Sequence, residues 1–214
     1  MQSYAQRLEG YLRNDPRLNH LYTRAKEAFD KKDLIAHGWD HTYRVIINAI
    51  RIGEAEGADM AIVLPSVVLH DIGFLYNPDP KVHNVVGAEN CSGWLEKWGD
   101  EERTQIRSCI LTHKGKYRGF AFEPETLEAK VVCDADLLEK VGYIGILQGV
   151  RTFTEFAQST DINFKSLRGI AQTLAHIVDI PFYTKTGQKI ADQRGGYLRA
   201  ALCKKALSEL DDYL

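Results

Sequence analysis

The sequence contains few cysteines, and no two of them are closely spaced. The four thiols are Cys91, Cys109, Cys133 and Cys203. A disulfide framework and a thiolate zinc site both require denser cysteine patterns. We therefore interpret these residues as buried free thiols.

An excess of charge of one sign is also absent. The chain has 27 Lys and Arg against 29 Asp and Glu, which gives a formal net charge of -2. Such a balance provides no general basic field and excludes duplex nucleic acid and anionic membranes as expected partners. The longest apolar run, residues 61–69, is interrupted by Pro65 and Ser66 and is far shorter than the roughly 20 residues of a membrane span. The polar N-terminus resembles neither a secretory leader nor a lipidation site, so the cytoplasm is the expected location.

Three common catalytic motifs are missing as well. We find no G-x-S-x-G nucleophile elbow, no G-x-x-x-x-G-K-[ST] phosphate loop and no G-x-G-x-x-G fingerprint. These absences argue against a serine hydrolase, a P-loop ATPase and a dinucleotide-dependent dehydrogenase.

Alternating apolar and polar runs are nearly absent, whereas apolar residues recur at spacings of three and four along almost the whole chain. This periodicity predicts an all-α fold. The expected helices cover residues 4–12, 16–30, 39–56, 60–72, 82–98, 101–113, 124–141, 145–158, 166–178 and 186–210. We expect Asp100 to cap the sixth of these and Pro124 to lie in the first turn of the seventh.

Histidine and aspartate stand side by side at the end of the most apolar predicted helix. Val63, Val67 and His70 share one face of that helix, which is expected to pack inward. The neighbouring carboxylate of Asp71 then needs a partner, because an unpaired buried charge is strongly disfavoured. A divalent cation would satisfy both side chains.

Two other segments carry the same residue types. His37 and His41 are four residues apart and could both face one ion, as in an H-E-x-x-H metallopeptidase. Gly38 stands where such an enzyme has its catalytic Glu, which argues against a zinc peptidase. Farther along, Asp134 and Asp136 point in directions roughly 200° apart around a helix. Only one of the two can reach an ion, and periodicity does not indicate which.

The order of these residues is similar to that of a known family. With His41, His70, Asp71 and Asp136, the sequence resembles the HD-domain metal-dependent phosphohydrolases, whose signature is H…HD…D, over about residues 35–140. The resemblance implies that these four residues are metal ligands and selects Asp136 over Asp134. It also implies a single-domain HD helical bundle over residues 1–214, with a C-terminal helical extension over 141–214 like that of small bacterial members.

Two further histidines suggest a larger site. His83 begins the segment H-N-V-V-G, which is similar to the H-P-x-x-G element of the dinuclear HD-GYP branch, and His113 ends a predicted helix. Together they could hold a second metal ion or contact phosphate. Asn84 stands where that branch has Pro, and no Gly-Tyr-Pro triplet follows, so cyclic-dinucleotide cleavage is not supported.

Imidazole and carboxylate ligands without thiolate suit Mn²⁺, Fe²⁺, Co²⁺, Ni²⁺, Mg²⁺ or Zn²⁺, and we favour Mn²⁺ or Fe²⁺. The resemblance implies a divalent-metal-dependent phosphohydrolase that hydrolyses a nucleotide-like phosphomonoester or phosphoanhydride through metal-activated water. Asp71, Lys114 and Arg44 are the expected catalytic residues, although Arg44 could instead form an ion pair with a site carboxylate. The residues expected to contact the substrate are Lys116, Arg118, Tyr76 and His37.

Two other functions fit the same residues. One is an HD-type di-iron oxygenase, because six residues (His41, His70, Asp71, His83, His113 and Asp136) could hold two irons. The other is a regulatory module that binds a nucleotide without turnover. Iron content and an O₂-sensitive optical band would favour the first, and nucleotide binding without phosphate release would favour the second.

Overall fold

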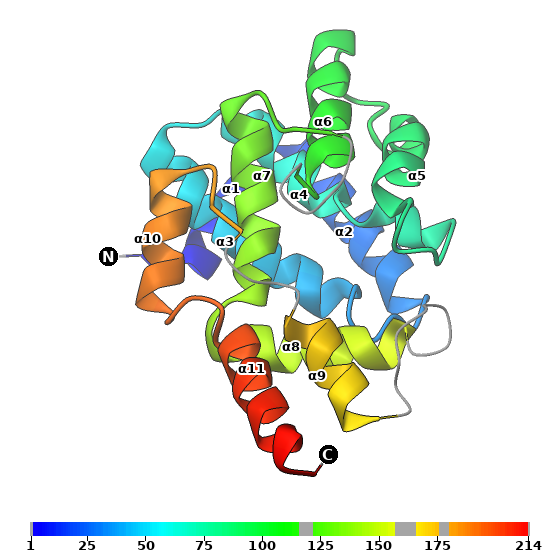
Figure 1. Cartoon of the computed structure of the whole chain (residues 1–214). Coiled ribbons are helices and arrows are strands. Elements are labelled where there is room, and N and C mark those ends of the chain that lie inside the picture. Colours follow the sequence, from blue (N-terminus) through cyan, green and yellow to red (C-terminus); the bar gives the residue numbers. More distant parts are fainter. Residues whose placement is uncertain (1, 116–121, 157–165, 176–179, 214) are drawn as a thin grey trace.

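The computed structural model describes residues 2–115, 122–156, 166–175 and 180–213. The α-helices are α1 (Tyr4–Asn14), α2 (Pro16–Asp30), α3 (Trp39–Glu56), α4 (Met60–Leu69), α5 (His83–Asn90), α6 (Asp100–Thr112), α7 (Leu127–Leu137), α8 (Gly142–Phe156), α9 (Leu167–Ala175), α10 (Lys185–Gln193) and α11 (Leu198–Leu210) (Figure 1). Short 3₁₀ helices are η1 (Ile72–Leu75), η2 (Cys91–Trp94), η4 (Leu138–Lys140) and η5 (Asp211–Tyr213). No strand occurs in these described ranges, so the all-α prediction is confirmed.

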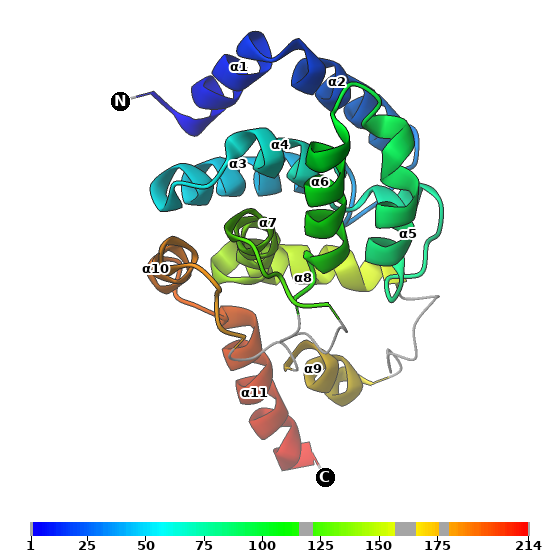
Figure 2. The ribbon, with the colours of Figure 1, turned by 90° about the horizontal axis from the view of Figure 1, so that it is seen from above.

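The core is built around α4, in which every residue from Ile62 to Leu69 is buried. Helices α2, α3, α6 and α7 all pack against it. Figure 2 shows α1 and α2 along one side of the molecule, α3 and α4 next to them, and α9 and α11 at the opposite side. A helix that is apolar on all faces is expected at such a central position.

The connection between α3 and α4 is short for local reasons. Gly57 ends α3 in the left-handed conformation, with φ 75°, and the Asp59 side chain caps the first turn of α4. The two helices therefore form a hairpin, and the end of α4 returns to the first turn of α3. This hairpin brings His41 and His70 into contact.

Several helix boundaries differ from those predicted. The expected helix over 82–98 is divided into α5 and η2, and the one over 186–210 is divided into α10 and α11. The second break occurs at Gly195 and Gly196, whose positive φ angles of 84° and 61° interrupt a right-handed helix. Helix α7 begins only at Leu127, after its cap Thr126, so Pro124 precedes the helix.

The start of α6 also differs, because its N-cap is Gly99 and Asp100 is its first residue. Among the described residues, no helix combines the length and apolar character needed to cross a membrane.

Candidate metal centre

Side chains from α3 and from the turn that follows α4 meet in a first buried cluster. The Nε2 atoms of His41 and His70 are 3.3 Å apart, and they lie 3.4 Å and 3.3 Å from Asp71 Oδ2. Asp136 on α7 joins them through Oδ1, which is 3.4 Å from His41 Nε2. All four side chains are at least nine-tenths buried. The first cluster is therefore His41, His70, Asp71 and Asp136.

A second cluster lies on the other oxygen of the same aspartate. Asp71 Oδ1 is 3.2 Å from His83 Nε2 and 3.5 Å from His113 Nε2, and these two nitrogens are 3.2 Å apart. His83 begins α5 and His113 follows α6. Asp71 thus belongs to both clusters, with one carboxylate oxygen in each.

Hydrogen bonds fix the orientation of three imidazoles. The Nδ1 atoms of His70, His83 and His113 donate to the main-chain oxygens of the residues three positions earlier, at distances of 2.7, 2.9 and 2.7 Å. Because a carbonyl only accepts, Nδ1 carries the proton and Nε2 of a neutral ring carries a lone pair. In each of these three rings the lone pair is directed into the clusters.

This arrangement fits a divalent cation at each cluster. Facing lone pairs of His83 and His113 repel each other unless a cation lies beside them, and Asp71 Oδ2 is buried without a hydrogen-bond partner among the described residues. Donors about 2.1 Å from one ion, at angles of about 90° to 110°, lie about 3.0 to 3.4 Å apart. The separations within the two clusters lie in or close to this range.

The pKa shifts of the cluster residues also favour bound cations. Burial would raise the pKa of Asp71, but the neighbouring His70, His113 and His41 hold it well below its usual value. Burial lowers the pKa of His83 to about 3 and also lowers the pKa of His113. For His41, burial opposes the charged form, yet Asp136, Asp71 and Glu139 outweigh it and raise the pKa well above its usual value. The carboxylates therefore favour positive charge in the first cluster, while the second offers neutral imidazoles.

The two neighbouring aspartates of α7 have different contacts. Asp136 is directed toward His41, whereas the buried Asp134 accepts hydrogen bonds from the main-chain N–H groups of Tyr183 and Thr184, at 2.9 and 2.7 Å, and from the Thr184 hydroxyl. One aspartate thus joins the cluster and the other anchors the segment that leads into α10.

Glu139 is a buried residue near the site that the sequence analysis did not single out. Its Oε2 accepts a hydrogen bond from Arg44 Nε at 2.6 Å and lies 3.6 Å from His41 Nδ1. Arg44 also contacts Asp40 and Gln148. The guanidinium is thus bound to a site carboxylate, which was one of its two expected roles. Lys140, also not singled out, places its Nζ 3.2 Å from Asp136 Oδ2.

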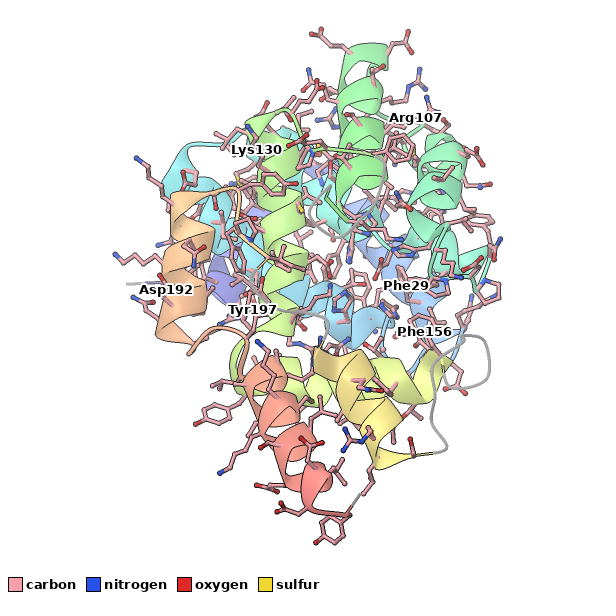
Figure 3. The ribbon with its side chains drawn as sticks, in the orientation of Figure 1. Phe29, Arg107, Lys130, Phe156, Asp192 and Tyr197 are labelled. Carbon is pink, nitrogen blue, oxygen red and sulfur yellow. The ribbon has the colours of Figure 1, made fainter. Side chains whose placement is uncertain are left out.

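Aromatic rings border the second cluster. Phe74 stacks on His83 with ring centroids 4.2 Å apart, and the His37 ring lies 4.5 Å from Phe74 and 6.3 Å from His83. Phe156, labelled in Figure 3, lies at the C-terminal end of α8. Its ring centroid is 5.2 Å from that of His37. Glu155 holds the His37 ring through a 2.5 Å contact to Nδ1. His37 is therefore fixed close to both clusters but is in neither.

The other expected site residues lie in different surroundings. Lys114 Nζ donates to the main-chain oxygens of Pro80 and Lys81, at 2.7 and 3.3 Å. Tyr76 is half-exposed, and its hydroxyl accepts a hydrogen bond from Trp94. Lys116 and Arg118 lie outside the described residues.

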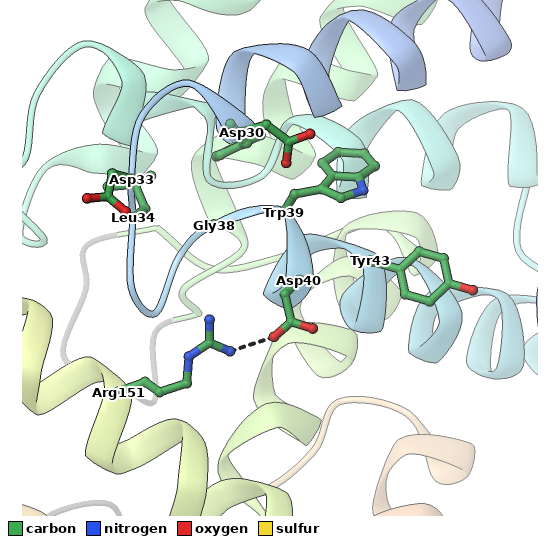
Figure 4. A pocket seen from close by; sticks show the side chains of 9 residues that line it. Asp30, Asp33, Leu34, Gly38, Trp39, Asp40, Tyr43 and Arg151 are labelled. Atoms are coloured by element: carbon green, nitrogen blue, oxygen red, sulfur yellow. Dashed lines mark hydrogen bonds and ion pairs between the residues drawn. The ribbon is translucent and has the colours of Figure 1, made fainter.

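A separate pocket of about 510 Å³ opens beside the first turn of α3 (Figure 4). Among its lining residues, Asp40 forms an ion pair with Arg151 at 2.6 Å, and none of the cluster histidines contributes to the lining. This pocket is distinct from the two clusters.

Comparison with known proteins gives a consistent set of matches. Residues 38–140 match the family model of the HD domain. The uncharacterized protein YpgQ of Bacillus subtilis (strain 168) is 33% identical over 111 residues, which cover 51% of this chain and only 54% of that protein.

Solved structures match over more of the chain. A predicted HD superfamily hydrolase from an uncultured Thermotogales bacterium superposes with a TM-score of 0.59 and 26% identity, covering 89% of this chain and 91% of the other. B. subtilis YpgQ in complex with ADP superposes with a TM-score of 0.57 and 20% identity, covering 93% and 95%.

Proposed function

We propose that this chain, whose residues 38–140 match the family model of the HD domain, is a divalent-metal-dependent phosphohydrolase acting on a nucleotide-like phosphomonoester or phosphoanhydride. The observation that carries the proposal is the pair of buried histidine clusters that share the two oxygens of Asp71. A bridging carboxylate between two nitrogen-rich sites is suited to two cations that act on one phosphoryl group.

Each cluster would hold one ion. The first ion would be bound by His41, His70, Asp71 Oδ2 and Asp136, and the second by Asp71 Oδ1, His83 and His113. Mn²⁺ or Fe²⁺ suits this mixture of imidazole and carboxylate. When bound, these ions supply Lewis-acid stabilisation of the phosphoryl oxygens and lower the pKa of a water molecule.

The surrounding residues have supporting tasks in this proposal. Phe74 and Phe156 form an apolar wall beside the second cluster, which excludes bulk water and strengthens electrostatic interactions there. His37, held by Glu155, is placed to donate a hydrogen bond to a substrate oxygen. Lys114 and Arg44 remain candidates for phosphate binding, although each is already bonded to protein oxygens.

A nucleotide is the substrate class that we favour. The ADP complex of the structural relative YpgQ supports this choice. Tyr76 and the rings beside His37 offer faces on which a base could stack.

The test combines metal analysis with a substrate panel. We expect the full-length chain, loaded with Mn²⁺, to retain two equivalents of metal and to release phosphate or pyrophosphate from some of the nucleoside mono-, di- and triphosphates. Asp71→Asn should lose both properties while keeping its helical circular-dichroism spectrum, because both clusters lose their shared charge. The exposed Asp212→Asn is the matched control. No product from any substrate with fully loaded wild type, or full activity of Asp71→Asn, would overturn the proposal.

A second candidate follows from the same bridging carboxylate. Two irons held through Asp71 would suit an HD-type di-iron oxygenase. Protein that retains iron, develops an O₂-sensitive optical band and releases no phosphate would favour this alternative. A protein that binds nucleotides but leaves the whole panel intact would instead favour a regulatory module.

A further inference from the structure

The four cluster histidines are not held in the same way. Three of them donate Nδ1–H to the carbonyl oxygen three residues earlier. The equivalent oxygen for His41 is that of Gly38, which already accepts hydrogen bonds from the Thr42 main chain and hydroxyl. His41 Nδ1 is instead buried, faces Glu139 Oε2 at 3.6 Å and has no hydrogen-bond partner among the described residues. A carboxylate takes the position that a main-chain oxygen takes beside the other three rings.

Glu139 is fixed in this position by two residues of α3. Arg44 Nε donates to Oε2 at 2.6 Å, and Asn48 Nδ2 lies 3.4 Å from Oε1. The Asn48 amide is itself held, because Arg194 donates to its Oδ1 at 3.0 Å. The Glu139 carboxylate is only 1% exposed, so it cannot turn toward solvent. At 3.6 Å, His41 Nδ1 and Glu139 Oε2 lie just beyond hydrogen-bond distance, so a hydrogen bond requires them to approach by a few tenths of an ångström.

We propose that Glu139 is a positioning residue that accepts a hydrogen bond from the Nδ1–H group of His41 and so keeps the Nε2 lone pair of His41 directed toward Asp71 and Asp136. This inference rests on the proposed function, because it assumes that the first cluster holds a metal ion. A carboxylate acceptor also increases the electron density of an imidazole more than a carbonyl does, which strengthens its bond to a metal. The first cluster should therefore bind its ion more tightly than the second, and the difference should depend on Glu139.

The experiment measures metal binding in the absence of substrate. Titration of metal-free full-length protein with Mn²⁺ in a calorimeter should resolve a tight and a weaker site in wild type. Glu139→Gln should weaken the tight site by about 10- to 100-fold and leave the weaker one within threefold. Glu155→Gln is the matched control, because it changes a largely enclosed carboxylate, with a side chain 10% exposed, that contacts a histidine outside the clusters. We expect the control to leave both affinities within threefold of wild type.

The outcomes separate this inference from the proposed function. If wild type binds no metal, the proposed function fails. If wild type binds two ions and Glu139→Gln binds both with unchanged affinity, the role of Glu139 is refuted.

A measurement on wild type covers the case in which Glu139→Gln does not fold. In Zn²⁺-loaded protein labelled with ¹⁵N-histidine, we expect His41 to show a protonated Nδ1 and a metal-bound Nε2. A metal-bound Nδ1, or an Nδ1 that carries no proton, would overturn the inference.

Discussion

Replacing Gly73 by Ala should disturb the second cluster while leaving the first in place. Gly73 lies in η1, two residues after Asp71, and its α-carbon faces the first residue of α5. A Cβ at this position would lie 1.9 Å from the main-chain oxygen of His83 and 2.9 Å from its Cα. Real Cβ contacts are essentially never below 3.0 Å, so the main-chain oxygen of His83 and the new Cβ must move apart by at least 1.1 Å.

The fold offers little room for this movement. Gly87, one turn further along α5, also packs against η1, and a Cβ there would meet Gly73 N at 3.3 Å. Metal ligands must keep their places within about 0.5 Å, so the displacement is more than twice the tolerance of the site. We expect at least a tenfold loss of affinity for the second ion and a destabilisation of about 1–3 kcal/mol.

The assay is a Mn²⁺ titration of metal-free Gly73→Ala protein, with thermal unfolding in parallel. Gly93→Ala is the control, because its added Cβ would meet nothing within 4 Å. The variant should bind one ion with wild-type affinity and the second weakly. Two ions bound as in wild type, with unchanged thermal stability, would refute the packing argument and the assignment of His83 to a metal.

Two further predictions concern stability away from the clusters. Asp134→Ala should destabilise the protein by about 2–4 kcal/mol in urea unfolding without loss of metal, because three donors from Tyr183 and Thr184 lose their buried acceptor; loss of metal in this variant would contradict the division of roles with Asp136. Asp15→Ala should cost about 1 kcal/mol at pH 7, because Asp15 caps α2. Although burial raises the pKa of Asp15, hydrogen bonds from Arg17 and Leu18 lower it overall, so the stabilisation is present above the ordinary value and is lost as the pH falls through the depressed pKa. The free energies of unfolding of wild type and Asp15→Ala should therefore converge as the pH falls below the ordinary value of 3.8, and a gap that stays constant over that range would contradict the assigned cause.

Helical periodicity was sufficient to locate most helices, because each buries one apolar face against the core. The predicted limits of α2 and α3 agree with the structure at both ends, where Pro16 begins one helix and Gly57 ends the other. The prediction was wrong where a long apolar pattern hid a break. The pattern over residues 186–210 continues through Gly195 and Gly196, and only their positive φ angles reveal two helices. A glycine pair within an apparent helix was the signal that could have indicated this.

The carboxylates near the site show why periodicity alone could not assign roles. Asp134 and Asp136 are both buried on α7, and their difference arises from residues about 50 positions away, at the start of α10, and from His41. The family resemblance selected Asp136 because its pattern carries that tertiary information. Glu139 lies outside that pattern. A glutamate between the buried Leu138 and Val141, one turn after a candidate ligand, was nevertheless a signal for a buried carboxylate with a partner.

Lys114 follows His113 in the sequence, but its contacts are with the segment that holds His83. A lysine directly after His113 was interpreted as a cation for phosphate. Its ammonium group instead donates to Pro80 O, the same oxygen that accepts the Nδ1–H of His83. The Pro80 carbonyl thus links Lys114, which follows His113, to His83, the other histidine of the second cluster. Two of the three ammonium donors are thus used on the main chain just before His83. Its position therefore favours a role in holding the second cluster together, and a direct contact with substrate stays a prediction.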